Sequence, residues 1–199
     1  MNFKNVKLFY MLCCFALCIV IILPTLILFI SYPKVEKFSE IWLLGPNRRL
    51  GDYPYNISVG ETYKVFIGIG NNMGDLEYYL VTTKLRNRTD ISTGAVIAPS
   101  DTSISLFEYR AFLADANTLE KEFTFSFDTV SFKKNVSMIS QLTINGHSLK
   151  IDKTATWDTA TNGFYYQLFF ELWTYDAIAG GFKSYDWSVQ LRLNLSPTI

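Results

Sequence analysis

The chain has 199 residues and a formal net charge of zero, with 18 basic and 18 acidic side chains. A balanced charge with no basic stripe and no nucleic-acid motif excludes the nucleic-acid-binding classes. All three cysteines lie within the first 18 residues, so no internal disulfide can stabilise the remainder, and its stability must come from a hydrophobic core.

The first expected element is a transmembrane helix over residues 8–32, which contain no charged side chain. As a helix, this run would reach about 37 Å, enough to cross a hydrocarbon core of about 30 Å. A cleavable signal has roughly 7–15 apolar residues and a small-residue cleavage site, and this run is longer and lacks such a site. We therefore predict an uncleaved signal anchor that contacts membrane lipid, preceded by a short cytoplasmic tail of residues 1–7.

Four Asn-x-Ser/Thr sequons follow this helix, which favours an exported domain because N-glycans are attached to exported chains. Lysines flank the helix on both sides, so the charge distribution gives almost no bias of orientation. We expect a single-pass plasma-membrane protein with its carboxyl-terminal domain outside the cell. The candidate glycosylation sites are Asn56, Asn87, Asn135 and Asn194.

After a juxtamembrane connector, residues 33–39, the chain is expected to form one β-domain over residues 40–199. Apolar and polar residues alternate with the period of a strand, as where Phe123, Phe125 and Phe127 alternate with polar residues. The patterns predict strands at 63–69 and 76–85 joined as a hairpin, at 103–113, at 137–144 before an Asn-Gly turn, and a closing hairpin of 164–175 and 182–195. About eight strands without a convincing helix predict an all-β fold, an immunoglobulin-like antiparallel β-sandwich.

The order of several short motifs in this domain resembles one family. The motifs include FSEIWLLGP at 38–46, DYP at 52–54, VGE at 59–61, VFIGIGN at 65–71 and FELW at 170–173. This order is similar to the archaeal membrane-associated family known as domain of unknown function 1616, over residues 38–196. The resemblance implies an archaeal envelope protein with an extracellular β-sandwich, and it implies no activity because none is established for that family.

Residues suited to catalysis are scarce outside the expected helix. His147 is the only histidine, and it follows Asn145-Gly146, so we expect an exposed turn residue and not a triad member. No cysteine remains there to bind zinc, and the aspartates do not have the spacing of a calcium loop. We predict no catalytic, metal or cofactor site and no enzyme. A hydrolase built on two carboxylates is the least favoured alternative.

The strand predicted over residues 164–175 carries large side chains on both faces. Its even-numbered residues suit the core, and its odd-numbered residues form an aromatic face suited to a protein interface or to stacking on a sugar, unless another part of the chain covers it. We therefore expect a non-catalytic accessory or interaction subunit of a cell-envelope protein complex. The alternative is a carbohydrate-binding or adhesive surface module. The candidate interaction residues are Tyr165, Phe169, Trp173 and Tyr175.

Overall fold

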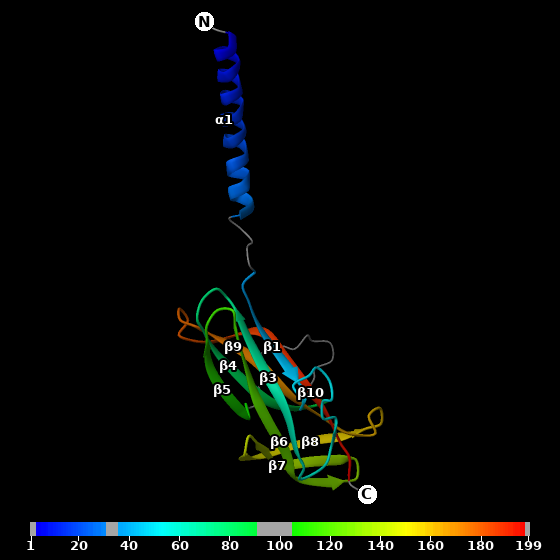
Figure 1. The fold of residues 1–199 in the computed structure, drawn as a ribbon. Helices are drawn as coiled ribbons and strands as arrows, with labels where there is room; N and C mark the ends of the chain where they lie inside the picture. The colour runs from blue at the N-terminus through cyan, green and yellow to red at the C-terminus, as the bar shows by residue number, and fades with distance from the viewer. Residues whose placement is uncertain (1–2, 31–35, 91–104, 198–199) are drawn as a thin grey trace. The chain divides into compact units, whose positions relative to one another are not determined.

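A computed structural model describes residues 3–30, 36–90 and 105–197, and Figure 1 shows the fold. The chain forms two compact units, residues 1–37 and 38–199. The first contains α1 (Phe3–Ile30), a helix of 28 residues. Among the described residues, only 6–24 of α1 form a helical segment long and apolar enough to cross a membrane, and none of this segment is buried in protein. A membrane anchor and a signal sequence share these properties.

The second unit is built from strands. Its described residues form β1 (Phe38–Leu44), β2 (Asn56–Ile57), β3 (Thr62–Asn72), β4 (Glu77–Asn87), β5 (Phe107–Leu113), β6 (Asn117–Lys133), β7 (Val136–Ile144), β8 (His147–Asp158), β9 (Gly163–Asp176) and β10 (Gly181–Leu195). The all-β class predicted from the alternating pattern is confirmed.

The strands are arranged in two sheets. The first sheet has the order β1-β3-β6-β7-β8, and the second has the order β5-β4-β9-β10-β2. All these neighbours are antiparallel except β10 and β2, which are parallel. The last two residues of β8, Trp157 and Asp158, pair with the start of β9, so β8 joins the two sheets at one corner.

The core lies between the sheets and is rich in aromatic side chains. The ring of Phe123 on β6 meets that of Phe170 on β9 edge to face, with centroids 5.0 Å apart, and Phe127 meets Tyr166 at 6.0 Å. All four side chains are almost completely buried. Full burial of one such side chain stabilises a fold by roughly 1.5–3 kcal/mol. The domain is therefore a β-sandwich held by its core.

The predicted hairpin of the strands at 63–69 and 76–85 is wrong, although both strands exist. β3 pairs with β1 and β6, whereas β4 pairs with β5 and β9. Residues 73–76 therefore carry the chain from the first sheet to the second. The Asn71 side chain fixes this crossing, because its amide donates to the carbonyls of Asp75 and Leu113 at 2.7 and 2.8 Å. Turn residues predict where a chain reverses, but not which strand it meets next.

Three other local features can be compared with the predictions. β1 begins at Phe38, inside the segment expected to be a connector. The predicted turn at Asn145-Gly146 is confirmed, since both residues have positive φ (46° and 79°) and join β7 to β8 as a hairpin. The closing hairpin of β9 and β10 is also confirmed.

Candidate functional site

The outer face of the second sheet contains the four predicted interaction residues, and they differ in exposure. The even-numbered side chains of β9 belong to the core, so its odd-numbered side chains point outwards. Phe169 is nevertheless completely buried and Tyr165 is buried, while Trp173 is half-buried and Tyr175 is 39% exposed. Phe169 is therefore not accessible to a partner. The middle of the face differs from its two ends.

The middle of this face is occupied by a buried charged cluster. The guanidinium of Arg86 lies 3.6 Å from the centroid of the Phe169 ring. The carboxylate of Glu171 lies 3.0 Å from Lys84 Nζ and 3.8 Å from Arg86 Nη2, and all three charged side chains are buried. Since a desolvated charge is tolerated only beside a partner, these side chains pair with one another within the sheet, and the middle of the face does not form an open site.

Four aromatic rings lie side by side at one end of this face. They belong to Tyr78, Phe112, Tyr175 and Phe182, which we call the aromatic row, and they come from β4, β5, β9 and β10. The register brings them together, because Tyr78 pairs with Phe112, and Tyr175 pairs with Phe182. Ring centroids are 4.2 Å apart for Tyr78 and Phe112, 5.9 Å for Tyr78 and Tyr175, and 5.5 Å for Tyr175 and Phe182.

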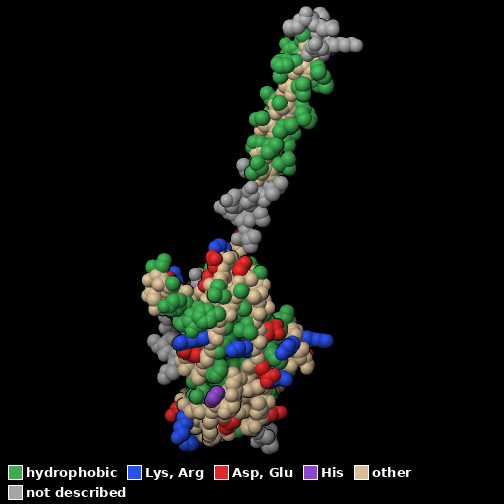
Figure 2. All heavy atoms as spheres, turned by 60° about the vertical axis from the view of Figure 1, so that its left-hand side comes forward, with side chains coloured by type: hydrophobic (Ala, Val, Ile, Leu, Met, Phe, Trp, Pro, Cys, Tyr) green, Lys and Arg blue, Asp and Glu red, His purple; other side chains and the backbone are tan. Residues whose placement is uncertain are grey.

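The aromatic row is open to solvent and is extended by aliphatic side chains. Phe112 is 68% exposed, and Leu76 and Ile178, on the adjoining turns, are also exposed. The guanidinium of Arg110 lies 5.4 Å from the centroid of the Phe182 ring. Figure 2 shows a patch of hydrophobic side chains on this side of the sandwich, with Lys and Arg side chains beside it. Contiguous exposed apolar surface of this kind marks interaction sites.

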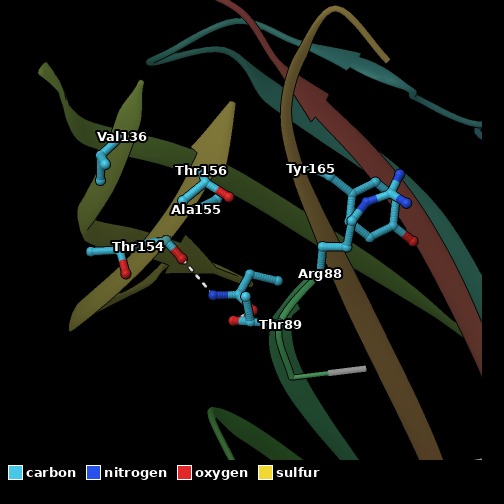
Figure 3. Close-up of a pocket in the computed structure, with 8 residues that line it drawn as sticks. Arg88, Thr89, Val136, Thr154, Ala155, Thr156 and Tyr165 are labelled. Carbon is cyan, nitrogen blue, oxygen red and sulfur yellow. Dashed lines mark hydrogen bonds between the residues drawn. The ribbon is translucent and has the colours of Figure 1, made fainter. Parts of the chain in front are cut away.

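A pocket of about 240 Å³ lies at the opposite end of the second sheet, beside β7 and β8 of the first sheet. Figure 3 shows Arg88 and Tyr165 on one side of the pocket, facing Val136, Thr154, Ala155 and Thr156. The Arg88 guanidinium lies 5.1 Å from the centroid of the Tyr165 ring and forms an ion pair with Asp158. Burial raises the pKa of Tyr165 above its ordinary value, although Arg192 and Arg88 oppose the shift. The pocket therefore combines an aromatic ring, a cation and hydroxyl groups.

The four sequon asparagines fall into two groups. Asn56 and Asn135 are exposed, whereas Asn87 and Asn194 are only 8% and 5% exposed. The Asn87 amide donates to the carbonyl of Thr154 at 2.7 Å, which is the dashed line in Figure 3. The same sequence motif thus lies in two different environments.

Side chains considered for catalysis lie apart from these two ends or have structural roles. His147 is exposed at the start of β8, where it pairs with Ile144 across the hairpin. Asp176 accepts hydrogen bonds from the backbone amides of Ala179 and Ile178, and these bonds lower its pKa. In the described ranges of the chain, no three His, Cys, Asp or Glu side chains are grouped as a metal site would require.

Sequence reasoning found one member of the aromatic row, Tyr175, and one aromatic residue of the pocket, Tyr165. The other members of the row lie at positions 78, 112 and 182, on strands whose pairing the sequence did not indicate. The local signal for such a residue is an aromatic side chain close to turn residues, as for Phe112 before the turn at 114–116.

These features define an all-β sandwich domain preceded by an apolar helix, with an exposed aromatic row at one end and a polar pocket at the other. The chain belongs to the family described as Domain of unknown function (DUF1616), whose model matches residues 33–139. The comparison with curated proteins gave no match.

Similar solved structures are distant. One is a β-glucosidase from Listeria innocua in complex with glucose, with 10% identity and a TM-score of 0.41, where the match covers 84% of this chain and 17% of the glucosidase. Another is a CARDB domain from Pyrococcus furiosus in complex with di-metal ions, with 6% identity and a TM-score of 0.39, where the match covers 83% of this chain and 98% of that domain. Likenesses this weak carry no argument about function.

Proposed function

We propose that this protein is a single-pass membrane protein whose extracellular β-sandwich acts as a non-catalytic interaction subunit of a cell-envelope protein complex. α1 would be the anchor. Its 28 residues correspond to about 42 Å of helix, which exceeds the hydrocarbon core of about 30 Å. Four sequons in the β-domain support its placement outside the cell.

The aromatic row is the observation that carries the interaction role. Phe and Tyr bury a large area at a small cost in side-chain entropy, and they are enriched in the centres of protein interfaces. Charged side chains border the row, since Glu108 and Arg110 alternate with Phe112 along the outer face of β5. An apolar centre with a charged rim is the usual anatomy of a protein–protein contact.

The row lies at the end of the sandwich where the chain enters β1. Phe38, the first residue of β1, pairs with Asn72, the last residue of β3, and β4 with Tyr78 follows one short turn later. Because α1 would anchor this chain in the membrane, we expect the partner that contacts the row to be another membrane protein.

The ring geometry favours a protein over a sugar at this end. Tyr78 and Phe112 are stacked on each other with an angle of 10° between their planes. One face of each ring is consequently covered by the other ring, and the open ring face in this pair is the outer face of Phe112. A sugar would stack on that one face, whereas a protein surface can pack against the faces and edges of all four rings.

The test is purification of the full-length protein from its native membrane in mild detergent, with co-purifying chains identified by mass spectrometry. We expect a stoichiometric partner, and we expect Tyr78→Ala with Phe112→Ala to reduce its recovery about tenfold or more. Tyr55→Ala, which removes an exposed aromatic ring outside the row, is the matched control and should retain the partner. Wild-type protein that purifies alone, or a row variant that keeps its partner, would contradict the proposal.

A carbohydrate-binding module is the second candidate, and the pocket favours it. Arg88 and the hydroxyl groups of Thr154 and Thr156 offer hydrogen-bonding groups beside the Tyr165 ring. We expect Arg88→Ala to weaken retention of the protein on immobilised envelope polysaccharide if the pocket binds sugar, while the aromatic-row variant binds normally. Equal retention of wild type and Arg88→Ala would remove this candidate.

A further inference from the structure

All four sequons gather around the beginning of β9, at the end of the sandwich remote from the aromatic row. Asn194 pairs with Tyr165, and Asn87 pairs with Tyr166. Asn56 pairs with Asn194. The carbonyl of Asn135 accepts a hydrogen bond from the amide of Trp157, next to the same strand start. Tyr175 of the aromatic row is ten residues further along β9, which corresponds to about 33 Å.

Asn87 is held inside the domain by both ends of its side-chain amide. Its Nδ2 donates to the carbonyl of Thr154, and its Oδ1 accepts from Thr89 Oγ1 at 2.7 Å and from the Asp90 amide at 3.0 Å. The nitrogen that would carry a sugar therefore points at the β8 backbone. The hydroxyl of its own sequon, on Thr89, is used to fix the side chain.

Asn194 is held on β10 by the nitrogen of its side-chain amide. Its Nδ2 donates to Asn56 Oδ1 at 3.1 Å. Its side chain also lies against Gly163, where an added Cβ would come within 2.1 Å of Asn194 Oδ1. The Asn194 amide is therefore packed against the start of β9 and is only 5% exposed.

The other two asparagines are exposed to solvent. Asn135 is exposed on the turn between β6 and β7, beside Lys134, whose φ of 55° lets the turn project from the sheet. Asn56 is exposed as well, and its contact with Asn194 uses the oxygen of its amide. In both cases a glycan linked to Nδ2 would extend into solvent without disturbing a strand.

We infer that Asn56 and Asn135 are N-glycan attachment sites, and that Asn87 and Asn194 are structural asparagines that stay unmodified in the folded protein. The inference rests on the extracellular placement in the proposed function. In the reaction, the amide Nδ2 attacks C1 of a lipid-linked oligosaccharide, an N–C bond forms, the bond from C1 to the phosphate oxygen breaks, the lipid phosphate leaves and the amide loses one proton. The glycans would cover the end of the domain remote from the aromatic row and leave the row bare.

The test combines intact-glycopeptide mass spectrometry with thermal unfolding of the full-length protein from its native membrane. We expect glycan mass on the peptides that contain Asn56 and Asn135, and loss of that mass in Asn56→Gln and Asn135→Gln. Asn135→Gln should leave the Tm unchanged. Asn87→Gln and Asn194→Gln should remove no glycan mass and should lower the Tm by about 3 °C or more, because each displaces a buried hydrogen-bonded amide.

Glycan on Asn87 or Asn194 in the folded protein, or bare Asn56 and Asn135, would overturn the inference. Labelling of intact cells with a membrane-impermeant amine reagent separates this failure from that of the proposed function. A labelled domain with bare Asn56 and Asn135 overturns the glycan assignment alone. An unlabelled domain overturns the extracellular placement together with the assignment.

Discussion

The rings of Tyr78 and Phe112 stack with their centroids 4.2 Å apart and their planes at 10°, across the pairing of β4 with the edge strand β5. This pair forms the part of the aromatic row that lies on β4 and β5. In the described part of the chain, no further strand pairs with β5 beyond Phe112, so one side of the stack faces solvent. The contact is thus both a cross-strand pair and part of an exposed aromatic surface.

The stacked pair should be measurable as a coupling energy. In a double-mutant cycle of Tyr78→Ala and Phe112→Ala, we expect a coupling of about 0.5–1.5 kcal/mol in the free energy of unfolding by urea. The control cycle combines Tyr78→Ala with Tyr55→Ala, whose effects should add. Additive effects for Tyr78 and Phe112 would show that the stack is not formed in solution.

Position 68 should require a glycine, because the ring of Trp42 lies against it. A Cβ on Gly68 would come within 1.9–2.3 Å of three atoms of that ring, so a larger residue must displace it. We expect Gly68→Ala to lower the free energy of unfolding by about 1–3 kcal/mol. The cost should be smaller in a Trp42→Ala background, and an equal cost in both backgrounds would contradict this explanation.

The buried carboxylate of Glu171 should contribute more to stability than an exposed one. Glu171→Gln removes the negative charge beside Lys84 and Arg86, and we expect a loss of about 3 kcal/mol in the free energy of unfolding. The matched control is Glu122→Gln, which removes one partner of an exposed ion pair with Lys64 and should cost about 0.5 kcal/mol or less. Similar losses for both variants would contradict the burial of the cluster.

Tyr166 should make stability fall at alkaline pH. Burial raises the pKa of Tyr166 to about 12, although its hydrogen bond with Ser137 opposes the shift. Because the folded state binds this proton more tightly than the unfolded state, whose pKa is about 10, the stabilisation is complete below pH 10 and is lost as the pH rises to about 12. Urea unfolding of Tyr166→Phe should show a smaller loss between pH 10 and 12, and an unchanged profile would contradict the assignment.

Local alternation was sufficient to predict the central strands. Phe123, Phe125 and Phe127 alternate with polar residues, and this period of two is unambiguous in β6. The Asn145-Gly146 turn was equally clear, because both residues accept positive φ. The all-β class and the β-sandwich followed from such signals.

Pairing between strands could not be obtained in the same way. The members of the aromatic row are separated by 34 residues or more except for Tyr175 and Phe182, and only the register of four strands brings them together. Likewise, Lys84, Arg86 and Glu171 have the alternation of a solvated face and yet are buried. The strand pairing and the burial of these charged side chains depend on contacts between residues far apart in the chain. Such contacts cannot be predicted from the pattern of a single sequence.

Site-specific photo-cross-linking in the native membrane tests most directly whether the aromatic row binds another protein. The photoreactive residue p-benzoylphenylalanine takes the place of Phe112 in the full-length protein, and in a matched control it takes the place of Tyr55. We expect one discrete adduct with another membrane protein at position 112 and none with that protein at position 55. The absence of a protein adduct at position 112, or the same adduct at both positions, would contradict the role of the aromatic row as a protein-binding surface.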